Sequence, residues 1–248
     1  MLRFNTILIF IIHFIVSLCN AQSNDKIKNF GFEFTTIVPV DYFGAGPKNH
    51  VEDYSEIKMS SKIGYQFGMS IKTKYNERLY LESGINFLRR NFSLTGSSEF
   101  NGTLTSDTSS FGYISYGIPI RGLIFIRLAK KIFMNTSVGT SLDFYASAVN
   151  SKGFNYYIDH ISDRARWING SLNGEIGFEL RDQFKGTFHI GFGVNIPIST
   201  IAVTKLKYYY DDLNQNNYDR YDNIFLRGNF FSVILKYYLP KSLEDKNI

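Results

Sequence analysis

The chain has 248 residues, of which 44% are hydrophobic and 17% aromatic, and its 27 Lys and Arg against 22 Asp and Glu give a net charge of +5. This composition is that of a folded protein, which excludes an intrinsically disordered chain, and the length suits one domain or at most two. The single cysteine excludes a disulfide framework and a multi-cysteine metal site. The basic residues are dispersed, with Lys130 and Lys131 as one pair, so nucleic-acid binding is not indicated.

Residues 1–21 are predicted to be a secretory signal peptide. Arg3 supplies a positive start, residues 4–18 are mostly apolar, and residues 19–21 suit a cut after Ala21. Two alternatives stay open: an N-terminal membrane anchor, for which the apolar run is short, and a lipoprotein lipidated at Cys19, which follows a large residue. We expect an exported mature chain that begins at residue 22 and has no cysteine.

The body of the chain reads as β-strands, because apolar side chains alternate with small or polar ones. Residues 63–72, for example, read IGYQFGMSIK, in which every second residue is large and apolar. Successive side chains of a strand point to opposite faces, so this pattern predicts a strand with one apolar face. Eight segments show it: 30–35, 63–72, 81–87, 114–121, 134–144, 171–180, 188–196 and 231–239.

The connections between these segments alternate in length. Short polar breaks lie at 76–78, 129–131 and 181–185, and long breaks lie at 41–61, 95–110, 147–166 and 205–223. The chain therefore reads as four hairpins with long tips, joined by three short turns. Short turns on one side and long loops on the other are typical of outer-membrane barrels, whereas compact soluble domains rarely carry four long loops.

Two kinds of barrel fit the alternation. A soluble, lipocalin-like barrel would turn its apolar face inward, and a membrane barrel would turn it outward. The length of the strands, a polar face that mixes small residues with both charges, and aromatic residues at predicted strand ends favour the membrane. The aromatic residues expected to form an interfacial girdle are Tyr156, Tyr157, Tyr208, Tyr209, Tyr237 and Tyr238.

We therefore predict an all-β protein, an eight-stranded antiparallel transmembrane β-barrel with short periplasmic turns and long extracellular loops. The barrel domain is expected over residues 22–240, followed by a short C-terminal tail at 241–248. An even number of strands permits closure, and a barrel of eight fills its interior with side chains.

Four passages carry a family resemblance: CNAQS at 19–23, YLESGINF at 80–87, YISYGIPIRGLI at 113–124 and FFSVILKYYL at 230–239. On these the chain resembles the small outer-membrane β-barrel proteins of the Bacteroidetes type, the PorT-like or outer membrane protein beta-barrel domain family. It departs from their pattern in the residues after Leu239, since such strands often end the chain. The resemblance implies a cell outer membrane location, insertion by the barrel insertion machinery and, for one branch, assistance to a protein-secretion system.

Charged residues on the predicted polar face form a candidate lumen network. Mixed charges in a narrow lumen should pair, because an isolated buried charge is costly. Glu175 and Glu179 lie about 13 Å apart along one strand, too far to share a proton. The alternatives are a structural plug of ion pairs and a gated or proton-linked pore. The residues are Glu82, Arg121, Glu175, Glu179 and Lys236.

No catalytic arrangement is evident in the sequence. Outer-membrane lipid A deacylases place a serine two residues from a strand histidine, and at His189 that position holds Gly191. His50 and His160 fall in predicted loops. We expect no enzyme activity, no cofactor and no metal.

The loop after residue 205 is a candidate recognition surface, because it is rich in tyrosine and aspartate. Its spacing is not that of an EF-hand. The candidate residues are Tyr208, Tyr209, Tyr210, Asp211, Asp212, Tyr218 and Tyr221.

The main functional hypothesis is a non-enzymatic barrel that engages outer-membrane lipid, lipopolysaccharide or a protein partner through its loops or periplasmic rim. An accessory part of a secretion apparatus and a narrow solute channel are the alternatives.

Overall fold

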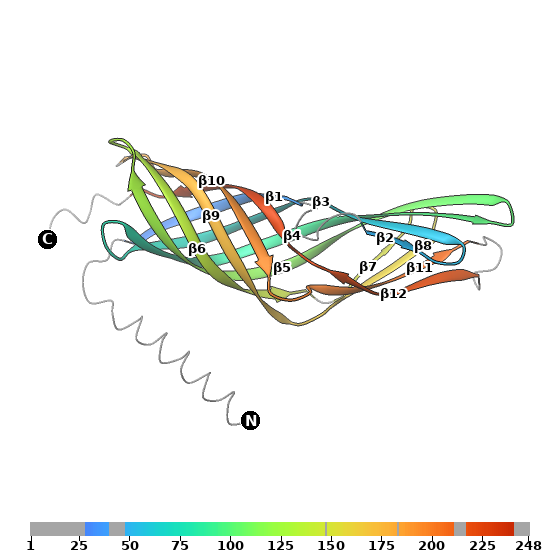
Figure 1. Cartoon of the computed structure of the whole chain (residues 1–248). Coiled ribbons are helices and arrows are strands. Elements are labelled where there is room, and N and C mark those ends of the chain that lie inside the picture. Colours follow the sequence, from blue (N-terminus) through green and yellow to red (C-terminus); the bar gives the residue numbers. More distant parts are fainter. Residues whose placement is uncertain (1–27, 40–47, 147, 183, 211–216, 241–248) are drawn as a thin grey trace, which may run out of the picture.

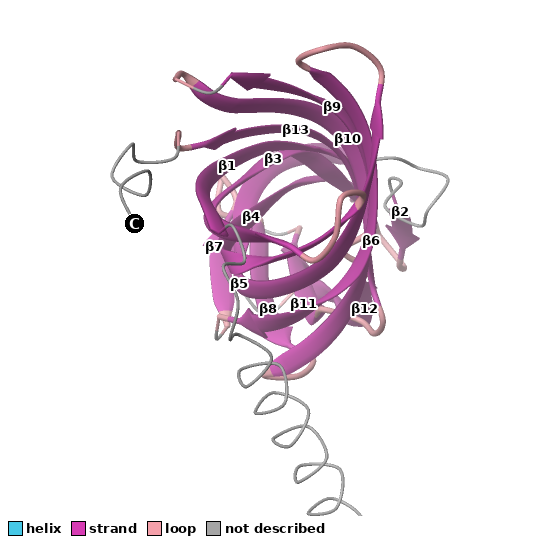
Figure 2. Ribbon diagram, turned by 90° about the vertical axis from the view of Figure 1, so that its left-hand side faces the viewer, coloured by secondary structure: helices cyan, strands magenta, loops and turns pink. Residues whose placement is uncertain are grey.

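Eight antiparallel strands close into a barrel in the computed structural model, which describes residues 28–39, 48–146, 148–182, 184–210 and 217–240. The ring closes because β1 pairs with both β13 and β3. Figure 2 shows the strands curving around the interior. The eight strands, in their order around the ring, are β1 (Lys28–Val38), β3 (Ser55–Lys74), β4 (Leu79–Phe100), β5 (Thr103–Arg127), β6 (Ile132–Tyr145), β9 (Ile168–Asp182), β10 (Gly186–Pro197) and β13 (Phe230–Tyr238). The predicted eight-stranded antiparallel barrel is thus confirmed.

The described parts of the four long breaks are mostly β-strands, whereas the sequence suggested structureless loops. β3, β4 and β5 run 20, 22 and 25 residues, well past the barrel. Beside them lie β2 (Lys48–Val51) and a second sheet of β12 (Tyr218–Leu226), β11 (Ala202–Tyr209), β8 (Ile158–Arg164) and β7 (Val149–Lys152). We call this part the extension and define it as residues 48–62, 90–113, 148–166, 199–210 and 217–228. Figure 1 shows it projecting from one end of the barrel.

Three short turns join strands at the other end of the barrel. The Asn76 side chain accepts hydrogen bonds from the amides of Arg78 and Leu79, at 3.0 and 2.7 Å. Asp182 accepts from the amides of Phe184 and Lys185 in the same way. Such side chains replace backbone partners in tight turns. The predicted short connections at 76–78, 129–131 and 181–185 therefore lie together at one end.

The barrel wall is apolar outside and polar inside. On β4, Leu81 and Ile85 face out with 41% and 60% of their surface exposed, whereas Glu82 faces in and is buried. The other strands alternate in the same sense, which is the reverse of a soluble barrel. Outward residues on the other strands include Phe32, Phe67, Ile118, Leu142, Ile176, Phe192 and Leu235. Within the described residues there is no helix long and apolar enough to cross a membrane.

The polarity reverses where the strands enter the extension. Beyond Phe87 the outward side chains of β4 are polar, beginning with Arg89, and the inward ones become apolar, at Phe92 and Leu94. The inward side chains form a core of 15 buried residues. In β3 one extra residue between Lys62 and Tyr65 accompanies the change, so that buried positions switch from odd to even numbers. Such a bulge inserts one unpaired residue.

Aromatic residues gather at the reversal, but they are mostly not those predicted. Tyr65, Phe87 and Tyr116 are in contact on adjacent strands, with ring centroids 6.2 and 5.7 Å apart. Trp167 packs on Phe144 beside them. The predicted girdle was largely wrong: Tyr208 and Tyr238 are buried inside, and residues 156, 157 and 209 lie in the extension, whereas Tyr237 is on the outer face.

Candidate functional site

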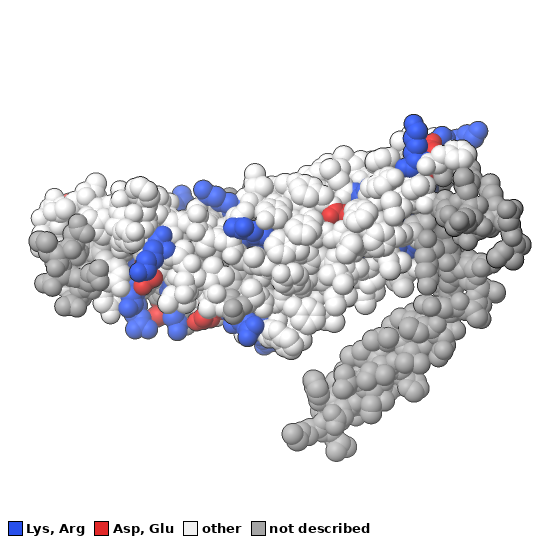
Figure 3. Space-filling view, turned by 180° about the vertical axis from the view of Figure 1, so that it is seen from behind, with Lys and Arg blue, Asp and Glu red and all other residues white. Residues whose placement is uncertain are grey.

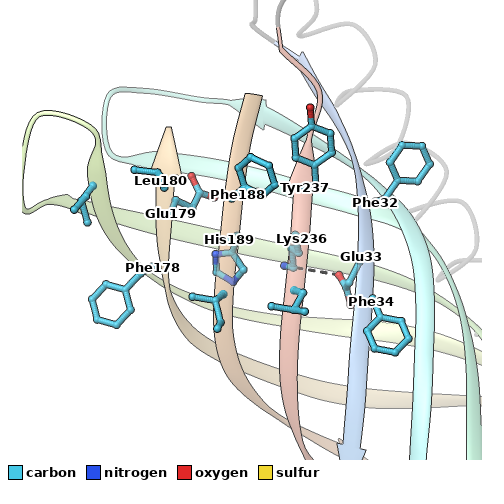
Figure 4. A pocket seen from close by; sticks show the side chains of 13 residues that line it. Phe32, Glu33, Phe34, Phe178, Glu179, Leu180, Phe188, His189, Lys236 and Tyr237 are labelled. Carbon is cyan, nitrogen blue, oxygen red and sulfur yellow. Dashed lines mark ion pairs between the residues drawn. The ribbon is translucent and has the colours of Figure 1, made fainter. Parts of the chain in front are cut away.

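Arg121 of β5 and Lys236 of β13 hold three carboxylates together inside the barrel. Arg121 Nη1 lies 3.0 Å from Glu33 Oε2, 2.9 Å from Glu82 Oε1 and 3.7 Å from Glu175 Oε2. Lys236 Nζ lies 3.0 Å from both Glu82 and Glu175 and 3.8 Å from Glu33. All five side chains are buried. Figure 4 shows Lys236 directed toward Glu33, while Phe32 and Phe34 point away from it.

Strand pairing positions these charges. Glu33 is directly opposite Lys236 across β1 and β13, and Glu82 is directly opposite Arg121 across β4 and β5. Because residues in register share a face, each carboxylate meets a cation on the inner face. Glu175 reaches the cluster from β9.

A second layer of charge lies nearer the short turns. Lys72 Nζ is 2.5 Å from Glu179 Oε1, and Arg181 Nε is 2.9 Å from Glu179 Oε2. Aromatic rings complete this layer: Lys72 lies 3.8 Å from the Tyr238 ring centroid, and Arg181 lies 4.0 Å from that of Phe133. Cations over ring faces are attracted by the ring quadrupole.

The sequence predicted an inner face for Glu82, Arg121, Glu175, Glu179 and Lys236, and all five lie there. Four of them form the first layer, whereas Glu179 belongs to the second. Sequence reasoning missed Glu33, Lys72 and Arg181 as members. It placed His189 on the polar face of its strand, as a lumen residue, without assigning it to the network. His189 Nε2 lies 2.7 Å from Glu175 Oε1 and its Nδ1 is 3.4 Å from the Asn135 amide nitrogen.

Side chains fill the lumen at the level of the first layer. The space bordered by Glu33, Gln66, Arg121 and Asn195 is about 30 Å³, room for roughly one or two water molecules. Four carboxylates and four Lys or Arg residues make up the two layers together. This arrangement suits a plug of ion pairs.

The described residues include no group of three or more His, Cys, Asp and Glu side chains arranged to hold a metal ion.

A serine–histidine contact is present in the extension, in a segment where the sequence predicted a loop. His160 Nε2 lies 2.7 Å from Ser162 Oγ, and His160 Nδ1 lies 2.9 Å from Ser151 Oγ. Ser162 Oγ is also hydrogen-bonded to Thr204 Oγ1, at 2.6 Å. His160 was expected in a loop, so its alternation with Ser162 on β8 was overlooked.

Burial argues that this chain of hydroxyls is structural. His160 and Ser162 have 0% of their surface exposed, and the Phe111 ring stacks on His160 at 3.9 Å. A nucleophile needs access to its substrate. Burial also lowers the pKa of His160 to about 4, so the imidazole is neutral at pH 7. One ring nitrogen then donates a hydrogen bond to a hydroxyl and the other accepts one.

Two tyrosines of the predicted recognition loop are part of the core of the extension. Tyr208 and Tyr221 are buried with 0% and 3% exposure, because β11 and β12 turn them inward. Burial raises the pKa of Tyr221 to about 12. Tyr209 and Tyr210 are half-buried and Tyr218 is 37% exposed. Asp211 and Asp212 lie outside the described residues.

A different group of apolar side chains is exposed at the far end of the extension. Phe154 is 85% exposed, Tyr156 is 74% exposed and Leu104 is 74% exposed. We call these three residues the tip. Tyr156 has a φ of 63°, a conformation that residues other than glycine rarely adopt.

The buried carboxylate of Asp107 holds this turn in place. Its Oδ1 accepts the amides of Thr108 and Asn155, and its Oδ2 accepts those of Tyr157 and Ile158, all at 2.8–3.0 Å. The turn is therefore fixed by one side chain. Nothing in the polar sequence around Asp107 distinguishes it from its neighbours, so sequence reasoning missed it.

The outer face of the barrel carries an apolar hollow of about 640 Å³ near the short turns. Phe32, Phe34, Phe178, Phe188 and Tyr237 line it, from β1, β9, β10 and β13. Charged side chains of the same strands point to the opposite, inner face (Figure 4).

No protein-family model and no curated protein sequence matches the chain. Among solved structures, it is similar to the outer membrane protease OmpT from Escherichia coli, with 9% identity, a TM-score of 0.37, and coverage of 88% of this chain and 98% of that chain. It is also similar to the translocator domain of the autotransporter NalP from Neisseria meningitidis, with 10% identity, a TM-score of 0.20, and coverage of 91% and 92%. Similarity this low carries no argument about activity.

Proposed function

We propose that this protein is a non-enzymatic β-barrel of the bacterial outer membrane that spans the membrane through its wall and binds a partner through the extension. The observation that carries this proposal is the reversal of polarity along the strands. An apolar outer face suits lipid, and an apolar core under a polar surface suits water. The reversal at Phe87 and Arg89 then lies at the membrane surface.

The distribution of charge supports this arrangement. Figure 3 shows the barrel wall as a largely uncharged band, with Lys and Arg side chains near the short turns and again where the extension begins. Charged side chains at mid-membrane are costly, whereas cations are favourable near lipid headgroups. We infer that the short turns face the periplasm and that the extension is extracellular.

The role in binding is proposed for the tip. Exposed aromatic side chains on a fixed turn lose little conformational entropy when a partner covers them. Phe154 and Tyr156 meet this description, because Asp107 fixes the turn that bears them. A conducting role has less support, since ion pairs cross the lumen.

Cysteine labelling of whole cells tests the location and the orientation together. The chain downstream of the predicted signal peptide has no cysteine, so Phe154→Cys and Lys130→Cys each introduce one thiol, at the tip and in a short turn. A membrane-impermeant maleimide should label Phe154→Cys in intact cells. It should label Lys130→Cys only after the cells are lysed. The wild type should stay with outer membranes after carbonate washing and change gel mobility on boiling. Labelling of Lys130→Cys in intact cells would show that the short turns face outward, opposite to the proposed orientation. A soluble protein whose gel mobility does not change on boiling would overturn the proposal.

A further inference from the structure

Three consecutive pairs of hydroxyl side chains lie side by side on the outer face of the β4–β5 hairpin. Each serine or threonine of β4 is directly opposite a serine or threonine of β5. All six side chains are exposed or half-buried. We call this row the hydroxyl ladder, and its pairs are Ser93 with Ser110, Thr95 with Thr108 and Ser97 with Ser106.

Two cations lie directly below the hydroxyl ladder, at the point where the outer face turns apolar. Arg89 and Lys62 are exposed on adjacent strands. Lys62 is directly opposite Asn91, and Arg89 precedes Asn91 by two residues on β4. Arg89 Nε donates to Asn91 Oδ1 at 3.1 Å, and Asn91 Nδ2 donates to the Ile63 carbonyl at 2.9 Å. The guanidinium is therefore positioned before any ligand binds.

Gly112 of β5 lets Arg89 lie flat on the sheet. A Cβ at this glycine would be 2.5 Å from Arg89 Nε. The guanidinium thus crosses from β4 onto β5, next to the first rung of the hydroxyl ladder. A cation held in this way presents its remaining N–H groups to the surface.

The charges around this level are mostly positive. Where the barrel wall meets the extension, five of the exposed charged residues that the structure describes are cations and one, Asp163, is an anion. Farther along the extension the outward charges balance, with six of each sign among the described residues. The boundary cations are Lys62, Arg89, Arg164, Arg166 and Arg227. Within the extension and its junction with the barrel wall, the excess of positive charge is therefore at the junction.

We propose that the outer face of β3, β4 and β5 binds the phosphorylated saccharide headgroup of a glycolipid. Lys62 and Arg89 contact the phosphate, because a guanidinium matches phosphate oxygens with paired donors. The hydroxyl ladder contacts the sugar, whose hydroxyls require alternating donors and acceptors. A phosphoglyceride would engage the cations and leave the ladder unused. This inference rests on the proposed outer-membrane location, with the extension outside.

Lipid binding by the purified full-length barrel tests the inference. The probes are phosphorylated lipid A, phosphatidylglycerol and phosphatidylcholine, offered in detergent and measured as bound lipid by native mass spectrometry. The wild type should prefer lipid A to phosphatidylglycerol and should bind phosphatidylcholine least. The double variant Lys62→Gln with Arg89→Gln should bind lipid A about tenfold more weakly. Gly112→Ala should act in the same direction, because it displaces Arg89.

The variants separate the two halves of the site. Thr95→Val with Thr108→Val keeps the β-branched shape and should weaken lipid A binding about threefold to tenfold, without changing phosphatidylglycerol binding. The matched control, Lys152→Gln with Lys205→Gln, removes two cations farther out and should bind as the wild type does. Equal binding of lipid A and phosphatidylglycerol, or unchanged binding by the Lys62 and Arg89 variant, would overturn the inference. Gel mobility on boiling is measured for each variant, so that loss of the barrel is distinguished from loss of the site.

Discussion

Lys72 and Glu179 are on opposite sides of the eight-stranded ring, with three strands between them in either direction, and yet Nζ and Oε1 are 2.5 Å apart. Their side chains cross the barrel and meet in its interior. A barrel of eight strands is narrow enough for such contacts to fill it.

We therefore expect the wild-type barrel to conduct no steady current in a planar bilayer. Ion pairs that cross the lumen occupy the space through which ions would have to pass. The check is a recording at symmetric high salt, compared with a bilayer that holds a known open barrel. Stepwise openings that survive repurification of the protein would contradict the plug.

Replacing Lys236 by Met should destabilise the barrel by about 3–5 kcal/mol, because Glu33, Glu82 and Glu175 would then share one cation. The measurement is the denaturant concentration at which the heat-modifiable gel form is lost. The control is Lys131→Met, which breaks a solvent-exposed pair with Asp182 and should change the midpoint far less. Similar effects of the two changes would contradict the role of the buried network.

The extension should lose stability in mild acid. Burial lowers the pKa of His160 from 6.5 to about 4, so between these values the unfolded state binds more protons than the folded state. Stability is therefore lost as the pH falls from 6.5 through 4, by about 3 kcal/mol in total. The loss of stability is measured by amide hydrogen exchange of β8 between pH 7 and pH 4.

The His160→Gln variant is the control for this acid effect. Glutamine retains hydrogen bonding to Ser162 and does not titrate. In this variant the free energy of opening measured by exchange of the β8 amides should not change over the same pH range. An acid-labile extension in this variant would assign the effect to another group.

Asp107→Asn should open the turn that bears Phe154. Asparagine keeps one acceptor oxygen and places an NH₂ group where Asp107 now accepts two amides. We expect chymotrypsin to cut residues 153–157 about tenfold faster than in the wild type. Asp163→Asn, at an exposed site on β8, should leave the rate unchanged.

Matched isoleucines test the polarity reversal. Ile118 in the barrel wall and Ile161 in the extension are each 40% exposed on an outward face. Arginine at 118 should cost about 2–4 kcal/mol and reduce the yield of inserted barrel, since it faces lipid. Arginine at 161 faces water and should be tolerated. The yield of heat-modifiable protein in outer membranes compares the two, and equal yields would argue against a lipid-facing wall.

The sequence was sufficient to predict the barrel strands, because alternation specifies which residues share a face. It could not identify all members of the charge network. Glu33 and Lys72 were visible on polar faces, but their partners depend on the stagger of strands distant in sequence. Lys72 meets Glu179, 107 residues away, and no local pattern encodes that contact.

The extension was missed for a different reason. Along β4 the even-numbered residues face inward throughout, as Glu82 and Asn86 in the barrel and as Phe92 and Leu94 beyond it. The alternation therefore continues past residue 87 with its polarity exchanged. Because the apolar side chains change from the outward to the inward face, a pattern with a single apolar face ends at this point, and the strand was predicted to end there too.

The bulge in β3 makes the two halves of that strand depend on a single residue of spacing. Without the extra residue between Lys62 and Tyr65, pairing with β4 would run in one register from end to end. Either Lys72 and Gln66 would then face lipid, or Ile57 and Met59 would face water. A one-residue deletion at this point would be far more damaging than a substitution at any of the residues involved, because it turns half of the strand inside out.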